Sequence, residues 1–161
     1  MREYIVTCCS TADMSRTFME TNEVPFAMFH YQLDGKEYAD VLYSSISPEV
    51  FYKMIGDGAQ PVTSQVNAEA YCALFEPVLK SGKDVLHLTL SSGISGSINS
   101  ANVAKAQMEE KYPDRRVMVV DSLAASSGYG MLVEQTLENQ RDGMSLEENA
   151  AWIVAHRNTL H

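Results

Sequence analysis

The stretch from Asp84 to Asn102 constrains the fold of this chain most strongly, because a strand, a loop and a helix start follow one another in it. Its first part is an almost continuous apolar run, which is typical of a parallel strand covered on both faces. That run consists of Val85, Leu86, Leu88 and Leu90. Small and polar residues follow it, namely Ser91, Ser92, Gly93, Ser95, Gly96 and Ser97. Apolar residues then recur with helical spacing at Ile98, Ala101, Ala104 and Met108. The stretch therefore predicts one strand–loop–helix unit of a parallel sheet.

The loop of serines and glycines is a candidate anion-binding site. The first N–H groups of a helix have no partner within the helix, and the helix dipole favours negative charge there. Glycine lets a ligand approach the backbone, and each serine hydroxyl can donate a hydrogen bond. No Lys or Arg lies between Asp84 and Asn102, so neutral donors would bind the anion, which favours a carboxylate or a single phosphate. The alternative is that Ser95 or Ser97 only caps the helix and the glycines only form the turn.

Composition limits the class of protein. With 161 residues, of which 45% are hydrophobic and 20% are charged, the chain suits one globular α/β domain. The formal net charge of -9 argues against a nucleic-acid or anionic-membrane partner, because clustered Lys and Arg bind phosphate groups. No apolar run approaches ~20 residues and the N-terminus lacks a signal-peptide pattern, so we expect a cytoplasmic protein without a membrane span.

The cysteines and the central histidine are expected to be core residues. Cys8, Cys9 and Cys72 have neither the number nor the spacing of a disulfide framework or a zinc site, so no metal is expected. Cys8 and Cys9 are consecutive on a predicted strand and are read as small core side chains. His87 lies in the middle of the central strand and is read as a core histidine whose hydrogen bonds are satisfied within the protein.

Strands and helices alternate along the chain. Residues 4–8 and 24–33 predict two strands, and Asp34-Gly35 predicts a hairpin turn with residues 36–41 as the returning strand. Residues 116–120 predict a further buried strand after the central one. This order predicts an α/β fold with a doubly wound, mostly parallel sheet, helices on both faces and an antiparallel hairpin at one edge.

Two helices have recognisable ends and inner faces. Ser47-Pro48-Glu49 predicts a helix start, and the apolar residues after it are expected to face the core. Those residues are Phe51, Met54 and Ile55. The next helix has an apolar stripe formed by Tyr71, Leu74, Phe75, Val78 and Leu79. Pro77 lies within that pattern and is expected to kink or split the helix.

Three polar segments are expected to meet at one edge of the sheet. They are Thr63-Ser64-Gln65, Ser91-Ser92-Gly93 and Asp121-Ser122. In a doubly wound sheet the loops that follow the strands gather at one edge, where ligands bind. Each segment alone is more typical of a helix cap than of a ligand site. Together the three segments form a candidate site.

The same segments resemble the DegV family of fatty-acid-binding proteins. The resemblance rests on Thr63-Ser-Gln, Ser91-Ser-Gly-Ile-Ser-Gly-Ser, Val120-Asp-Ser and Gly35-Lys-Glu-Tyr-Ala-Asp40, which occur in the order and at the spacing of that family. In the family, the first strand is usually followed by Asp-Ser-Thr-Ala-Asp. This chain has Cys9 at the first of these positions and keeps Ser10 to Asp13.

The resemblance implies a domain, a ligand and a partner. Residues 1–161 would be a single DegV-like N-terminal α/β domain, and the family's second domain, which encloses the acyl chain in a tunnel, would be absent. The ligand would be a long-chain fatty acid whose carboxylate is bound by Thr63 and Ser92, with Ser91 or Ser95 in place of Ser92 as the alternative. The implied ligand-binding residues are Thr63, Ser64, Ser91, Ser92, Gly93, Ser95 and Gly96. The protein would be no enzyme, would need no cofactor and would present the acid to a fatty acid kinase subunit.

Other functions compete with fatty-acid binding. A serine hydrolase would use the loop of Ser91 and Ser92 with His87 and Asp121, although the chain has no Gly-x-Ser-x-Gly elbow. A nucleotide site is disfavoured, because the loop has neither the lysine of a P-loop nor the Gly-x-Gly-x-x-Gly pattern. A truncated domain without a ligand of its own is the remaining alternative, and its uncovered apolar face would favour self-association.

Overall fold

The computed structural model describes residues 2–42 and 44–159. The elements in chain order are β1 (Tyr4–Cys9), the short 3-10 helix η1 (Ser10–Ala12), α1 (Arg16–Thr21), β2 (Phe26–Ala27), β3 (His30–Leu33), β4 (Lys36–Ala39), α2 (Pro48–Gly56), β5 (Val62–Ser64), α3 (Ala68–Lys80), β6 (Asp84–Thr89), α4 (Ser97–Lys111), β7 (Val117–Asp121), α5 (Ser126–Arg141) and α6 (Leu146–His156). Within the described ranges, no helix is both long enough and apolar enough to cross a membrane.

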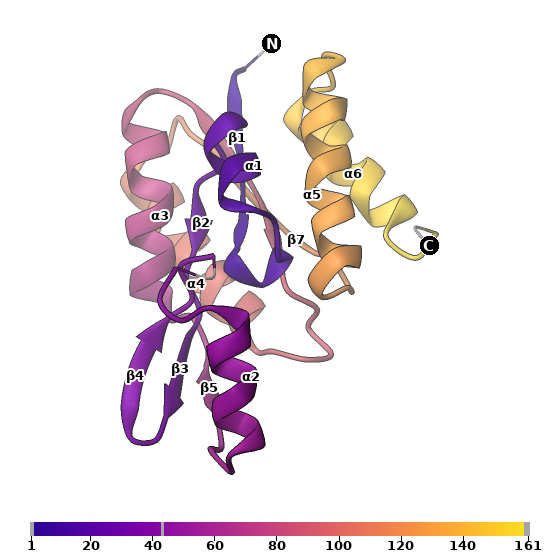
Figure 1. The fold of residues 1–161 in the computed structure, drawn as a ribbon. Coiled ribbons are helices and arrows are strands. Elements are labelled where there is room, and N and C mark those ends of the chain that lie inside the picture. Colours follow the sequence, from indigo (N-terminus) through magenta and orange to yellow (C-terminus); the bar gives the residue numbers. More distant parts are fainter. Residues whose placement is uncertain (1, 43, 160–161) are drawn as a thin grey trace.

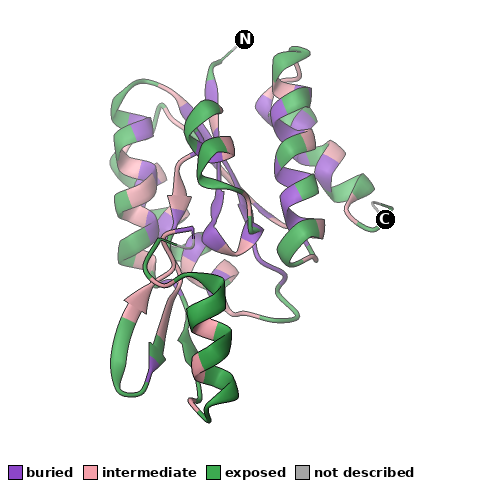
Figure 2. Ribbon diagram, in the orientation of Figure 1, coloured by how far each residue is buried: buried purple, intermediate pink, exposed green. Residues whose placement is uncertain are grey.

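The larger sheet has four parallel strands in the order β2-β1-β6-β7. At its centre, Tyr4 of β1 pairs with Asp84 of β6. Helices α3 and α4 pack together over one face of this sheet, and α5 and α6 pack together over the other (Figure 1). Every residue of β6 is buried, as a strand covered on both faces should be (Figure 2). The predicted doubly wound sheet and its central strand are confirmed.

The predicted strand over residues 24–33 is divided into two. Its first part is β2, the edge of the parallel sheet, and its second part is β3, which pairs antiparallel with β4 and β5. The hairpin at Asp34-Gly35 is confirmed, but it belongs to a separate three-stranded sheet, in the order β4-β3-β5, that extends beyond the parallel sheet (Figure 1). At the point where the two sheets separate, the N–H of Phe29 donates a hydrogen bond to Ser10 Oγ (3.1 Å), which is a tertiary contact.

Helix α2 begins at the predicted position but does not face the core. Ser47 is its N-cap and accepts the N–H of Val50, and Pro48 is its first residue. No residue of α2 is buried, and Ile55 is 36% exposed. The prediction of a core-facing side was wrong because α2 lies beside the small sheet rather than on the parallel one (Figures 1 and 2). Its aromatic contact with that sheet is an edge-on packing of Phe51 against Tyr31, with ring centroids 5.5 Å apart.

Helix α3 is continuous through Pro77, so the expectation that the helix splits there was wrong. The predicted inner face is largely confirmed, since Tyr71, Phe75, Val78 and Leu79 are buried. Pro77 lies in the last turn of the helix, where proline removes one bond to the carbonyl four residues earlier. That carbonyl belongs to Ala73, which is exposed, so water can satisfy it.

Gly130 marks a close approach between α5 and the loop after β1. A Cβ atom at Gly130 would lie 2.6 Å from Met14 Sδ and 2.7 Å from the carbonyl oxygen of Ala12. The Met14 side chain can move aside, whereas the Ala12 carbonyl is backbone. We therefore expect Gly130→Ala to lower the free energy of unfolding by about 1–3 kcal/mol, measured by urea denaturation. Gly128→Ala in the same helix is the control, because its Cβ would lie 3.8 Å from Ala124 Cβ. An equal response of both variants would contradict the close approach.

Candidate functional site

The strand order of the parallel sheet reverses between β1 and β6. The chain goes from β1 to β2 on one side and later to β6 on the other side of β1. In doubly wound sheets, ligands bind outside the carboxyl ends of strands at such a reversal. Here those ends lead into η1 with Asp13, after β1, and into the loop of residues 91–96, after β6. The sequence interpretation noted Ser10 to Asp13 but left this loop out of the candidate site, because its position at the reversal depends on the strand order.

Two of the three inner serines of the loop after β6 stabilise the loop itself. Ser91 is buried, its Oγ accepts the N–H of Gly93 (3.2 Å), and its carbonyl accepts the N–H of Ser95 (3.0 Å). Ser95 Oγ accepts the N–H of Ser97 (3.2 Å) and lies 2.7 Å from Ser97 Oγ. Ser95 thus bonds to the first residue of α4, but Gly96 is the N-cap residue and no side chain caps the helix, so the alternative in which Ser95 or Ser97 is the cap was wrong.

Ser92 differs from these serines because it is exposed. Its N–H donates to Asp121 Oδ1 (3.1 Å), an atom that also accepts the N–H of Leu123 (3.0 Å). Asp121 at the end of β7 therefore connects the loop after β6 to the loop after β7. This leaves Ser92 as the exposed serine of the loop, held in place by its backbone.

The Thr-Ser-Gln segment lies partly on β5, a strand of the small sheet, and not in a loop after a strand of the parallel sheet. Thr63 pairs with Tyr31, and Ser64 Oγ donates to the carbonyl oxygen of His30 (3.4 Å). The next residue contacts the serine and glycine loop, since a Cβ on Gly96 would lie 2.8 Å from Gln65 Oε1. The Thr63-Ser64-Gln65 segment thus meets the loop after β6 where Gln65 contacts Gly96. The Asp121-Ser122 segment meets the same loop where Asp121 accepts the N–H of Ser92, so all three predicted segments lie together.

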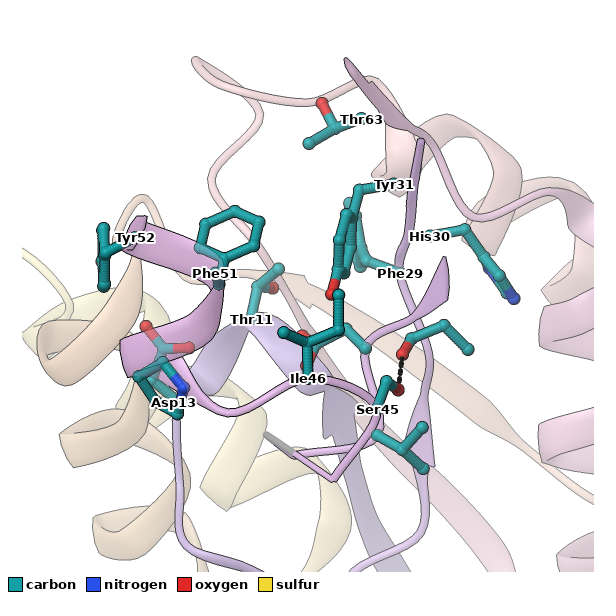
Figure 3. A pocket seen from close by; sticks show the side chains of 14 residues that line it. Thr11, Asp13, Phe29, His30, Tyr31, Ser45, Ile46, Phe51, Tyr52 and Thr63 are labelled. Atoms are coloured by element: carbon teal, nitrogen blue, oxygen red, sulfur yellow. Dashed lines mark hydrogen bonds between the residues drawn. The ribbon is translucent and has the colours of Figure 1, made fainter. Parts of the chain in front are cut away.

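A cavity of about 290 Å³ lies beside Thr63 (Figure 3). Phe29, Tyr31 and Phe51 supply aromatic side chains to its wall, and Thr11 from the loop after β1 also lines it. Its lining among the described residues includes Thr63 but none of residues 91–96. Pockets that enclose a whole drug-sized ligand measure roughly 300–1,000 Å³, so this cavity has room for part of a long ligand.

Tyr31 remains neutral in the cavity wall. Burial raises the pKa of its hydroxyl, and the nearby carboxylate of Asp40 and the Tyr38 side chain raise it further. Tyr31 also stacks on Tyr38, with ring centroids 5.4 Å apart. The tyrosine therefore offers a protonated hydroxyl and an apolar ring, without a negative charge.

His87 is completely buried below the site, as the sequence predicts. Its Nδ1 lies 2.8 Å from Thr7 Oγ1, and burial lowers its pKa to about 3. Cys9 Sγ lies 3.4 Å from the Tyr71 hydroxyl, and burial raises the pKa of Cys9, so both side chains are uncharged core groups. Cys8 is equally buried. Among the hydrogen bonds of the described residues, those of His87 go to Thr7 and Cys9 and none joins it to a serine of the loop.

Comparison with known proteins gives one consistent result. The pattern of the DegV family matches residues 5–161. A DegV domain-containing protein of Clostridium perfringens is 32% identical over 160 residues, which cover 99% of this chain and 55% of that protein. A fatty-acid-binding DegV family protein from Thermus thermophilus has a TM-score of 0.85 at 31% identity, covering 98% of this chain and 54% of that one. A stearic acid-binding protein from Eubacterium ventriosum has a TM-score of 0.85 at 29% identity, covering 94% and 52%.

The chain spans about half the length of these relatives. The shared region includes the parallel sheet, the small sheet and all the polar segments described above, because the family match begins in β1 and continues through the last helix. The chain belongs to the DegV family.

Proposed function

We propose that this chain binds a long-chain fatty acid and holds its carboxylate between Thr63 and Ser92, with the amides at the start of α4 as additional donors. The observation that carries the proposal is the contact of Gln65 with Gly96, because it joins the Thr63 segment to the Ser92 loop at the strand reversal. Neutral hydroxyls and amides suffice for a single carboxylate. The fatty-acid-binding relatives of similar fold support this choice of ligand.

The acyl chain would supply most of the affinity, at about 0.8 kcal/mol per buried methylene. Its first carbons would enter the cavity beside Thr63, which is too small for a whole long chain. Val62 on β5 and Ile94 in the loop after β6 are each 66% exposed, so each of the two segments that meet at Gln65 and Gly96 carries an exposed apolar side chain. We propose that a second domain, of the kind that the motifs shared with the family imply, would cover this surface. In the 161-residue chain alone, the same surface would favour self-association.

The proposal assigns a carrier role and no catalytic role. The carrier would present the bound acid to a fatty acid kinase in the cytoplasm, as the motifs shared with the family imply. His87, the histidine nearest in sequence to the loop of serines, is buried and bonded to Thr7, which leaves the exposed Ser92 without an activating base from that residue. A carrier without a nucleophile fits this arrangement better than a hydrolase.

Native mass spectrometry tests the proposal. We expect the purified chain, freed of lipid and incubated with stearic acid, to give a 1:1 adduct with the acid. A longer DegV relative treated in parallel should retain more of the acid on dilution, because it encloses more of the acyl chain. The absence of an adduct with this chain would contradict the proposed function, and equal retention by both proteins would contradict the shared enclosure.

A further inference from the structure

The position of Ser92 depends on a single hydrogen bond. Its N–H donates to Asp121 Oδ1 (3.1 Å), and it makes no other hydrogen bond to a described residue. Ser91 and Ser95, in contrast, are each held by hydrogen bonds within the loop after β6. A hydroxyl binds a ligand well only if it points at the ligand, because hydrogen bonds weaken steeply when they are bent. The direction of the exposed Ser92 hydroxyl is therefore set through Asp121.

One oxygen of Asp121 joins two loops. Its Oδ1 also accepts the N–H of Leu123 (3.0 Å) in the loop after β7, whereas its Oδ2 accepts no hydrogen bond from a described residue. The acceptor function thus needs one oxygen atom and not a charge. A bond between backbone groups also joins the two loops, since the N–H of Ser91 donates to the carbonyl oxygen of Ala124 (3.0 Å). Loss of the Asp121 side chain would therefore release Ser92 while the loops stay together.

Arg157 in turn fixes the backbone of Asp121. Helix α6 packs against α5 and β7, and Arg157 directly follows the last residue of α6 (Figure 1). Its Nη1 donates to the carbonyl oxygen of Asp121 (2.7 Å), and its Nε is buried, so packing also holds the side chain. None of the ion pairs between described residues includes Arg157 or Asp121. The guanidinium thus holds Asp121 in place, and its positive charge offsets part of the negative charge there.

The charge of Asp121 is unfavourable for the proposed ligand. Ser92 Oγ lies at most about 4 Å from the N atom of the same residue, so Asp121 Oδ1 lies within about 7 Å of that hydroxyl. A fatty acid carboxylate bound at Ser92 would be close to the Asp121 carboxylate, and salt screens like charges only partly at short range. Attraction to the acid therefore does not explain an aspartate here, whereas its two bonds to backbone N–H groups do.

We propose that Asp121 and Arg157 are positioning residues of the carboxylate site, and that through them the site distinguishes a fatty acid from a neutral lipid of the same length. The inference rests on the proposed function, because it requires Ser92 to donate to the carboxylate. A well-aligned hydrogen bond contributes more to binding of a charged group than of a neutral one. Misalignment of Ser92 therefore weakens binding of an acid, whereas an alcohol, which binds mainly through its alkyl chain, is affected less.

NMR titration of Asp121→Ala and Asp121→Asn with decanoic acid and with 1-decanol tests the inference. The two variants have the same charge, but only asparagine keeps a side-chain oxygen that can accept the N–H groups of Ser92 and Leu123. We expect the alanine variant to bind the acid about threefold to tenfold more weakly than the asparagine variant, and the alcohol less than about twofold more weakly. The Ser92 amide resonance should move upfield in the alanine variant only, because that variant alone loses the hydrogen bond.

Arg157→Met should likewise lower the affinity for the acid relative to the alcohol, and Arg157→Lys, which keeps the charge and a donor, should restore most of it. Asp142→Ala is the control for the loss of a carboxylate, because Asp142 is exposed and follows the opposite end of α5. It should leave the binding of both ligands unchanged.

The outcomes separate this inference from the proposed function. Equal acid affinity of Asp121→Ala and Asp121→Asn, or equal weakening of acid and alcohol binding, overturns this inference alone. If Asp121→Ala does not fold, Arg157→Met and Arg157→Lys decide, and equal ratios of acid to alcohol affinity in these two variants overturn the inference. Failure of the unmodified chain to bind decanoic acid overturns the proposed function as well.

Discussion

Acidification from pH 7 to pH 4 is expected to lower the free energy of unfolding by about 3 kcal/mol through His87 alone. His87 is completely buried, and this burial lowers its pKa to about 3 in the folded protein. In the unfolded chain the pKa returns to about 6.5. The unfolded state therefore binds a proton that the folded state excludes. The contribution of His87 to stability is complete above about pH 6.5 and is lost progressively as the pH falls toward 3.

Urea denaturation followed by circular dichroism between pH 4 and pH 7 measures this effect. The double variant Thr7→Val/His87→Leu removes the titrating group together with its hydrogen-bond partner, so neither partner is left buried and unpaired. We expect the double variant to lose this part of the pH dependence. His156→Gln, which changes an exposed histidine, should keep it. The same pH dependence in the double variant as in the unmodified chain would show that other groups cause it.

Removal of the two proposed carboxylate ligands should have the largest effect on binding. Thr63→Val and Ser92→Ala each remove one hydrogen bond to a charged group, worth about 1.5–3 kcal/mol, so we expect each to weaken stearic acid binding by about tenfold to a hundredfold. Isothermal titration calorimetry on the folded variants measures the loss.

Ser64→Ala is the matched comparison for Thr63→Val. Ser64 is the next residue on β5, but its hydroxyl donates to the His30 carbonyl and it does not line the cavity. Its loss should weaken binding less than either of the other substitutions. If all three variants bind the acid equally well, the carboxylate lies elsewhere. If Ser91→Ala alone weakened binding, the alternative ligand of the loop after β6 would be the correct one.

The parts of the fold with strong local signals could be predicted from the sequence. The apolar run at Val85–Leu90, the Asp34-Gly35 turn and the cap at Ser47 each act within a few residues of themselves, and all three are present in the structure. The division of residues 24–33 into β2 and β3 could not be predicted in this way. The contact between Ser10 and Phe29 at that point joins segments distant in sequence.

The candidate site shows the same limit. The polar segments with Thr63 and Ser92 could be found because serine, threonine and glycine cluster there in the sequence. The place of Thr11 and Asp13 in the cavity wall depends on the strand order, which places β1 beside β6, and no local pattern encodes that order. The separate roles of Ser91, Ser92 and Ser95 also required the structure, because hydrogen bonding within the loop distinguishes three chemically identical side chains.

The pairing of Tyr4 with Asp84 has a consequence for how the molecule forms during synthesis. The β3–β4 hairpin can form as soon as it leaves the ribosome, because its partners are adjacent in the sequence. The first strand, in contrast, must wait until half of the chain has been translated before its central neighbour exists. During that interval only the two-residue strand β2 can pair with this largely apolar strand, so the early nascent chain is the species most exposed to aggregation and most dependent on chaperones.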